Sequence, residues 1–93
     1  MKNELDVKAA AAAWRELCRA RDAHPKFNTD HEGYAVILEE LDELWDEIRK
    51  KKEKRNRTKL MKETMQIAAM CMRFASDLCP EELKKLGGKN EQD

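Results

Sequence analysis

Residues that break helices are scarce in this sequence: two prolines and three glycines interrupt 93 residues. Alternating runs of Val, Ile and Thr, which are typical of strands, do not occur. Because glycine and proline are the least favourable residues inside a helix, their scarcity leaves room for long, uninterrupted helices. The pattern therefore predicts an all-α fold.

Local start and stop signals divide the chain into three long helices and one short helix. The first ends at His24, because the residue before a proline is pushed out of helical geometry. Thr29, with Glu32 three residues later, is a capping-box pattern that starts the second helix. Thr58 is expected to cap the third helix, and Pro80 opens the short fourth one. The predicted helices cover residues 4–23, 29–50, 58–78 and 80–86.

The third helix is apolar on two sides, although the chain is too small to cover both. With 41% charged and 5% aromatic residues, a lone chain has little to bury. One apolar face carries Leu60, Ile67, Met70, Cys71, Phe74 and Leu78, and the other carries Met61, Met65, Ala68 and Met72. We expect an antiparallel helical bundle of three long helices and a short C-terminal helix, completed by homo-oligomerisation into a homodimer or homotetramer. A methionine-rich groove for another partner is the alternative.

The domain and its location follow from composition. Residues 1–86 are expected to form one domain, with 87–93 as a disordered tail. The 19 basic and 19 acidic residues cancel, so no overall field attracts nucleic acid or a membrane. The basic run 49–57 lacks aromatic residues that stack on bases, so specific nucleic-acid binding is not expected. No apolar segment reaches the roughly 18 residues of a membrane span. Three cysteines without a CxxC pair favour reduced, structural thiols in a cytoplasmic protein: Cys18, Cys71 and Cys79.

The second helix combines an apolar stripe with two sets of carboxylates. The stripe has helical spacing and predicts a core face made of Tyr34, Ile37, Leu38, Leu41, Leu44, Trp45 and Ile48. Along one edge of the stripe, spacings of three and four residues stack Glu40, Glu43 and Glu47 on neighbouring turns. The carboxylates that point away from the stripe are Glu39, Asp42 and Asp46. Stacked like charges repel one another, so the edge row is either a solvated surface or a site for a cation.

Glu63 lies inside the apolar stripe of the third helix. A buried carboxylate costs several kcal/mol unless it is paired, protonated or bound to a metal. The short connection favours antiparallel packing of the second and third helices, which would bring Glu40 and Glu43 within reach of Glu63. A hard divalent cation, by default Mg²⁺, would reconcile the three carboxylates. The alternative is that Glu63 reaches the edge of the stripe and pairs with Lys59.

Two short segments resemble the motifs of a known family. EELDE at 39–43 and ETMQ at 63–66 are similar to the EExxE and ExxD motifs of the MazG-like, all-α nucleoside triphosphate pyrophosphohydrolases. The resemblance covers residues 29–78 and implies that Glu40, Glu43 and Glu63 bind the metal, with Glu39 beside them in the catalytic set. Gln66 stands where the family has an aspartate. Its carbonyl oxygen can coordinate Mg²⁺, but it adds no charge and cannot serve as a general base.

The resemblance also implies an activity. Family members cleave a nucleoside triphosphate, of the ribo or deoxy series, into the monophosphate and pyrophosphate. Bound Mg²⁺ would neutralise and orient the triphosphate and activate the attacking water. Lys59, Lys62 and Arg73 are candidates to neutralise the remaining phosphate charge. Because Gln66 replaces an acid, the competing hypothesis is a catalytically weak or inactive helical homo-oligomer, which serves as a nucleotide-binding or protein-interaction module.

Overall fold

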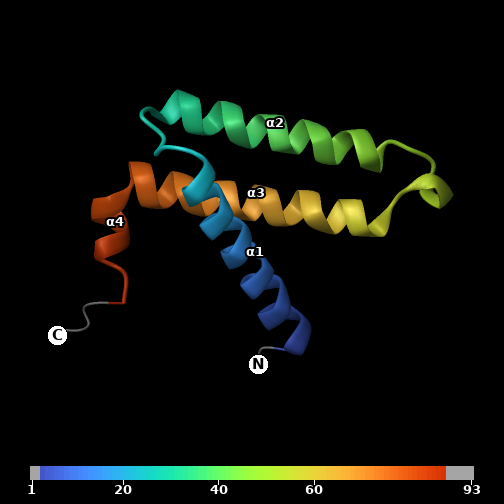
Figure 1. The fold of residues 1–93 in the computed structure, drawn as a ribbon, viewed down its shortest axis with the longest axis horizontal. Coiled ribbons are helices and arrows are strands. Elements are labelled where there is room, and N and C mark those ends of the chain that lie inside the picture. The colour runs from blue at the N-terminus through green and yellow to red at the C-terminus, as the bar shows by residue number, and fades with distance from the viewer. Residues whose placement is uncertain (1–2, 88–93) are drawn as a thin grey trace.

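The computed structural model describes residues 3–87, which form helices joined by short links. The elements are α1 (Glu4–Ala23), α2 (Asp30–Ile48), a 3-10 turn η1 (Lys52–Lys54), α3 (Arg57–Leu78) and α4 (Pro80–Lys84). No strand occurs within residues 3–87, so the predicted all-α class is confirmed. Figure 1 shows α2 and α3 side by side and antiparallel, while α1 crosses them steeply and α4 bends away from the end of α3. The long helices therefore form an antiparallel pair and a crossing helix, not three parallel rods.

Side-chain caps fix the starts of α1 and α2. Oδ1 of Asn3 accepts the N–H of Asp6 at 2.7 Å, and Oγ1 of Thr29 accepts the N–H of Glu32 at 3.0 Å. The Glu32 carboxylate reaches back to the N–H of Asn28, at 2.6 Å, and not to that of Thr29. The predicted capping box is thus present in a form shifted by one residue.

The cap of α3 is Asn56, and the prediction of Thr58 at this position is wrong. Oδ1 of Asn56 accepts the N–H of Lys59 at 3.0 Å, while Thr58 already lies in the first turn. Both residue types cap helices well, so the sequence offers two competing starts. Asn56 prevails because its own N–H donates to the Glu47 carboxylate, at 2.7 Å, and this bond holds its backbone outside the helix.

The core lies where α1 crosses α3. Leu17 and Ala20 of α1 are buried in one cluster with Ala69 and Met70 of α3, and Phe27 of the α1–α2 link completes it. All five side chains are apolar, so their burial supplies the main driving force for joining α1 to the α2–α3 pair.

Gly33 allows α2 and α3 to approach closely near the start of α2. A Cβ atom at this position would lie 2.5 Å from Cδ2 of Phe74 and 3.2 Å from Cδ1 of Leu78. The backbone of Gly33 is ordinary helix, so its conformation does not require glycine. The close packing against Phe74 and Leu78 does.

Asp77 of α3 ties three segments together. Its side chain is fully buried, its Oδ1 lies 2.7 Å from Nη1 of Arg21, and its Oδ2 accepts the N–H of Phe27 at 3.0 Å. The Arg21 contact is an ion pair and the Phe27 contact is a hydrogen bond to a charged acceptor, so Asp77 fixes the end of α1 and the following link onto α3.

The apolar stripe of α2 is only partly a core face, and the prediction that Trp45 belongs to the core is wrong. Trp45 is 57% exposed and Tyr34 is 62% exposed, and Leu38 and Leu41 are also exposed. Figure 1 shows the reason: α3 lies along one side of α2, and α1 crosses near one end of the pair. Among residues 3–87, nothing covers the outer side of α2.

The second apolar face of α3 partly meets α1. Met61 and Met65 line a groove together with Ala12 and Glu16 of α1, and Met72 packs against the buried core. Helix α1 therefore supplies part of the layer that the sequence assigns to a second copy of the chain. Met61 nevertheless remains 54% exposed.

Three smaller sequence predictions have mixed outcomes. The three cysteines are free thiols, but Cys18 and Cys71 are exposed, so the structural role predicted for these two is wrong. None of the helices in the described part of the chain combines the length and apolarity that a membrane crossing needs. Gly87 has a φ of 70°, which suits the end of a helical segment. The rest of the tail predicted over 87–93 lies outside the described residues.

Candidate metal centre

Three carboxylates converge between α2 and α3. Glu40 and Glu43 lie about one turn apart on α2, and Glu63 faces them from α3. One carboxylate oxygen of each residue lies within 4.8 Å of the other two. Glu63 is 9% exposed, Glu40 is partly buried and Glu43 is exposed, so this carboxylate cluster opens to solvent at Glu43. The antiparallel pair thus brings together the three acids that the sequence nominates as ligands.

Burial and mutual repulsion raise the pKa values of two of these groups. For Glu40, desolvation is the largest cause of the raised pKa, followed by the charges of Glu43 and Glu63. For Glu43, partial desolvation again comes first, then the Glu63 charge and a carboxyl–carboxyl hydrogen bond with Glu63. A cation placed among the three groups would favour their ionised forms and relieve this repulsion.

Two oxygens of the carboxylate cluster have no hydrogen-bond partner within residues 3–87. They are the buried Oε1 atoms of Glu40 and Glu63. Buried polar side-chain atoms are nearly always paired, so each of these two oxygens calls for an explanation such as a bound water or ion. Mg²⁺ prefers oxygen ligands and is usually held by a few carboxylates together with water. The donor set of Glu40, Glu43 and Glu63 therefore fits Mg²⁺.

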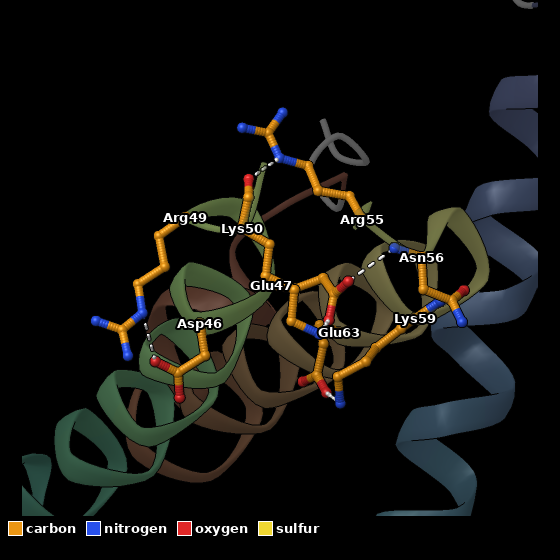
Figure 2. A network of polar contacts seen from close by, with 8 residues as sticks. All are labelled: Asp46, Glu47, Arg49, Lys50, Arg55, Asn56, Lys59 and Glu63. Carbon is orange, nitrogen blue, oxygen red and sulfur yellow. Dashed lines mark hydrogen bonds and ion pairs between the residues drawn. The ribbon is translucent and has the colours of Figure 1, made fainter. Parts of the chain in front are cut away.

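Lys59 occupies the edge of the carboxylate cluster. Its Nζ atom lies 3.4 Å from Oε2 of Glu63, four residues along α3. Figure 2 shows this pair beside the turn that joins α2 to α3. Glu63 therefore belongs to the carboxylate cluster and also makes the ion pair with Lys59 that the alternative hypothesis expects.

Glu47 has a structural role that sequence reasoning missed. It is 1% exposed, and its two oxygens accept hydrogen bonds from the N–H of Asn56, at 2.7 Å, and from Nζ of Lys50, at 2.9 Å. The backbone bond from Asn56 is the main cause of its lowered pKa, and Lys50 adds to the effect. Figure 2 shows Glu47 in the closed end of the α2–α3 turn. Its place in the row with Glu40 and Glu43 was the available signal, but the sequence does not show that the turn folds back over it.

A cleft of about 440 Å³ adjoins the carboxylate cluster between α1, α2 and α3. Glu39, Glu40 and Gln66 line one part of it, and Phe27 and Arg73 line another. Arg73 follows Glu63 by ten residues on α3, so Arg73 and the carboxylates lie at different positions along the cleft. Gln66 therefore faces the same cleft as Glu40.

The three residues nominated for phosphate binding do not gather in one place. Lys59 lies at the carboxylate cluster, while Lys62 lines the separate groove beside Met61 and Met65. Arg73 is 3% exposed; it donates to the carbonyl oxygen of Pro25 at 2.9 Å and lies 4.1 Å from the centre of the Phe27 ring. These contacts give Arg73 a structural role in holding the link before α2. Of the three, only Lys59 is placed to meet a phosphate bound at the cluster.

Comparison of the chain with protein-family models, with curated proteins and with solved structures finds no match.

Proposed function

We propose that this chain is a MazG-like nucleoside triphosphate pyrophosphohydrolase that uses Mg²⁺ held by Glu40, Glu43 and Glu63. The observation that supports the proposal most directly is the carboxylate cluster itself, in which one oxygen of each residue lies within 4.8 Å of the other two. The EExxE segment supplies two of its members and the ETMQ segment the third, as the family resemblance implies. Carboxylates of an ordinary solvated surface are exposed to water, whereas Glu63 is 9% exposed.

The proposed reaction is the attack of water on the α-phosphorus of the substrate. The water oxygen bonds to that phosphorus, the bond between the α-phosphorus and the bridging oxygen breaks, and pyrophosphate leaves. Bound Mg²⁺ supplies charge neutralisation and activation of the water. Glu39 is exposed beside Glu40 and lines the cleft, which supports a role for its carboxylate as the acceptor of the proton of the water. The cleft beside Glu40 offers room for the nucleoside.

A second candidate function follows from Gln66. In place of the family's aspartate, it leaves the proposed site with one charge fewer, which weakens metal binding. The same cleft and carboxylates would then serve a catalytically weak or inactive nucleotide-binding or interaction module. Binding of a nucleotide without release of pyrophosphate would favour this candidate.

We further propose that the chain self-associates as a homodimer or homotetramer. The apolar side chains that remain exposed on α2 and α1 support this, because large apolar patches on small proteins are commonly interaction sites. They include Val7, Trp14, Tyr34, Leu38, Leu41 and Trp45. In Figure 1 the N-terminal half of α1 also projects away from the α2–α3 pair.

The proposed activity is tested by incubating the protein with each common nucleoside triphosphate and Mg²⁺ and measuring pyrophosphate. We expect release by the native chain and its loss in Glu63→Gln, which removes one ligand charge without a change of shape. Glu81→Gln on α4 is the matched control, because Glu81 lies far along the chain from the cluster and pairs only with Lys84 among residues 3–87. Equal activity of the native chain and Glu63→Gln would refute the proposed site.

A further inference from the structure

Lys59 lies at the edge of the carboxylate cluster, and its charge acts on two members of the cluster, Glu63 and Glu43. Its ammonium lies 3.4 Å from Oε2 of Glu63 and its side chain is 51% exposed. Burial is the largest influence on the pKa of Glu43 and raises it, while the Lys59 charge acts in the opposite direction. In the metal-free protein, Lys59 thus supplies part of the positive charge that the carboxylates need.

The position of Lys59 is unfavourable for the helix alone. It lies in the first turn of α3, where the positive end of the helix dipole disfavours a cation. Lysine four residues before glutamate is also the weaker orientation for an ion pair of this spacing. A lysine at this position is therefore unfavourable for α3 alone, but its charge opposes the rise in the pKa of Glu43 on α2.

The backbone of Lys59 is fixed, whereas its side chain is half-exposed and its ammonium makes a long contact, 3.4 Å, with Glu63. Its N–H donates to the Asn56 side chain, and Asn56 is in turn held by Glu47. The long, flexible stem of lysine allows the ammonium to change partners without any shift of the helix. Lys50 differs, because its ammonium is bonded at 2.9 Å to Glu47, which lies outside the carboxylate cluster.

We propose that Lys59 acts as a resident counter-ion that exchanges partners: it leaves Glu63 when a divalent cation binds and then contacts the terminal phosphates of the substrate. The exchange rests on the metal site proposed above. A divalent cation among the three carboxylates would repel the ammonium and satisfy Glu63, whereas a bound triphosphate would attract the ammonium from the same side. Lys59 thereby binds the phosphates that leave as pyrophosphate.

The matched pair of variants is Lys59→Met and Lys62→Met. Each removes one positive charge from the exposed side of α3 and keeps an unbranched side chain, but Lys62 lines the groove towards α1 and not the cluster. The first probe is Mn²⁺ alone, a spectroscopic substitute for Mg²⁺, followed by its paramagnetic resonance signal. The second probe is inorganic tripolyphosphate in the presence of saturating Mg²⁺, which needs no assumption about the base.

The proposal predicts opposite effects on the two probes. Lys59→Met should bind Mn²⁺ about tenfold more tightly, because a competing positive charge is gone. The same variant should bind tripolyphosphate about tenfold more weakly, because a charge-assisted contact is lost. Lys62→Met should leave both affinities unchanged, and Lys59→Arg, which keeps the charge, should retain most of the tripolyphosphate affinity even if Lys59→Met folds poorly.

The outcomes separate failure of the exchange from failure of the site. If the native chain binds no Mn²⁺, the proposed metal site and the exchange both fall. If the native chain binds Mn²⁺ but Lys59→Met binds it equally or more weakly, the exchange is overturned and the metal site stands. Unchanged tripolyphosphate affinity in Lys59→Met likewise overturns the phosphate role of Lys59.

Discussion

The carboxylate of Glu47, at the end of α2, accepts the backbone N–H of Asn56 at 2.7 Å, so one side chain joins the last turn of α2 to the cap of α3. The bond closes the η1 turn and fixes where α3 starts alongside α2. The starting point of α3 in turn decides which of its residues face Glu40 and Glu43. Glu47 therefore positions Glu63 although it does not belong to the carboxylate cluster.

Glu47→Gln should lower the melting temperature of the metal-free protein by roughly 5–10 °C, because a buried, charge-assisted hydrogen bond is lost. The pKa of Glu47 is lowered in the folded state, so its contribution is present above the ordinary glutamate value of about 4.5 and disappears as the pH falls through the lowered value. The difference between native chain and variant should therefore be largest near neutral pH and shrink in acid. Asp46→Asn, at a side chain 66% exposed, is the control and should change the melting temperature little.

Gly33→Ala should destabilise the fold by about 1–2 kcal/mol, since the overpacking cost outweighs the better helix propensity of alanine. The new Cβ would lie 2.5 Å from the Phe74 ring, which must move. Urea titration measures the loss. The double variant Gly33→Ala with Phe74→Leu should recover part of it, whereas additive losses would show that the ring is not the obstacle.

The sequence predicted the helices well because their signals are local. Pro25 after His24, and Thr29 with Glu32, end α1 and start α2 at the observed places. Asn56 and Thr58 compete as caps, and a contact with Glu47, nine residues earlier, decides between them. Such a tertiary contact cannot be read from local preference.

The convergence of the three carboxylates could also be predicted from local patterns, whereas the side of α2 that is covered could not. Glu40 and Glu43 on one helix and a lone acid, Glu63, in the apolar stripe of the next meet as soon as the helices pack antiparallel. By contrast, the apolar stripe of α2 shows only which side chains are apolar, and not what covers them. Trp45 belongs to that stripe and is still 57% exposed, because α3 covers one side of α2 and α1 crosses near one end.

Trp45→Glu should shift the proposed oligomer towards monomer, because it places a charge on the exposed apolar side of α2. Sedimentation velocity at micromolar concentration would show a smaller sedimentation coefficient than that of the native chain. Lys52→Gln, in the exposed η1 turn, changes the net charge by the same amount and should leave the assembly intact. A native chain that sediments as a stable, folded monomer would contradict the oligomer.

Gln66→Asp should tighten Mg²⁺ binding and increase pyrophosphate release. Gln66 lines the same cleft as Glu40, so an aspartate there would add a charged oxygen ligand near the cluster. Isothermal titration with Mg²⁺ measures the affinity, and pyrophosphate release measures the activity. Gln66→Asn, which is shorter in the same way but neutral, is the control. Unchanged Mg²⁺ affinity in Gln66→Asp would mean that residue 66 does not contribute to the site.

Glu63→Gln should leave the metal-free protein at least as stable as the native chain near neutral pH. Its amide can donate to the neighbouring carboxylates, including the unpaired Oε1 of Glu40, and it removes one of the repelling charges. The pKa values of Glu40 and Glu43 are raised in the folded state, first by desolvation and then by neighbouring acids. Such groups stabilise the fold below the ordinary glutamate value of about 4.5, and this stability is lost as the pH rises through the raised values.

The advantage of Glu63→Gln over the native chain should therefore grow between pH 4.5 and neutrality and vanish in acid. At neutral pH, Mg²⁺ should make the native chain more stable than Glu63→Gln. At a concentration one hundred times its Kd, Mg²⁺ should stabilise the native chain by about 2.7 kcal/mol and Glu63→Gln far less. Thermal unfolding with and without Mg²⁺, at several pH values, measures both effects, with Glu81→Gln as the control. A Glu63 that only pairs with Lys59 gives the opposite result: a less stable variant at neutral pH and no response to Mg²⁺ in either protein.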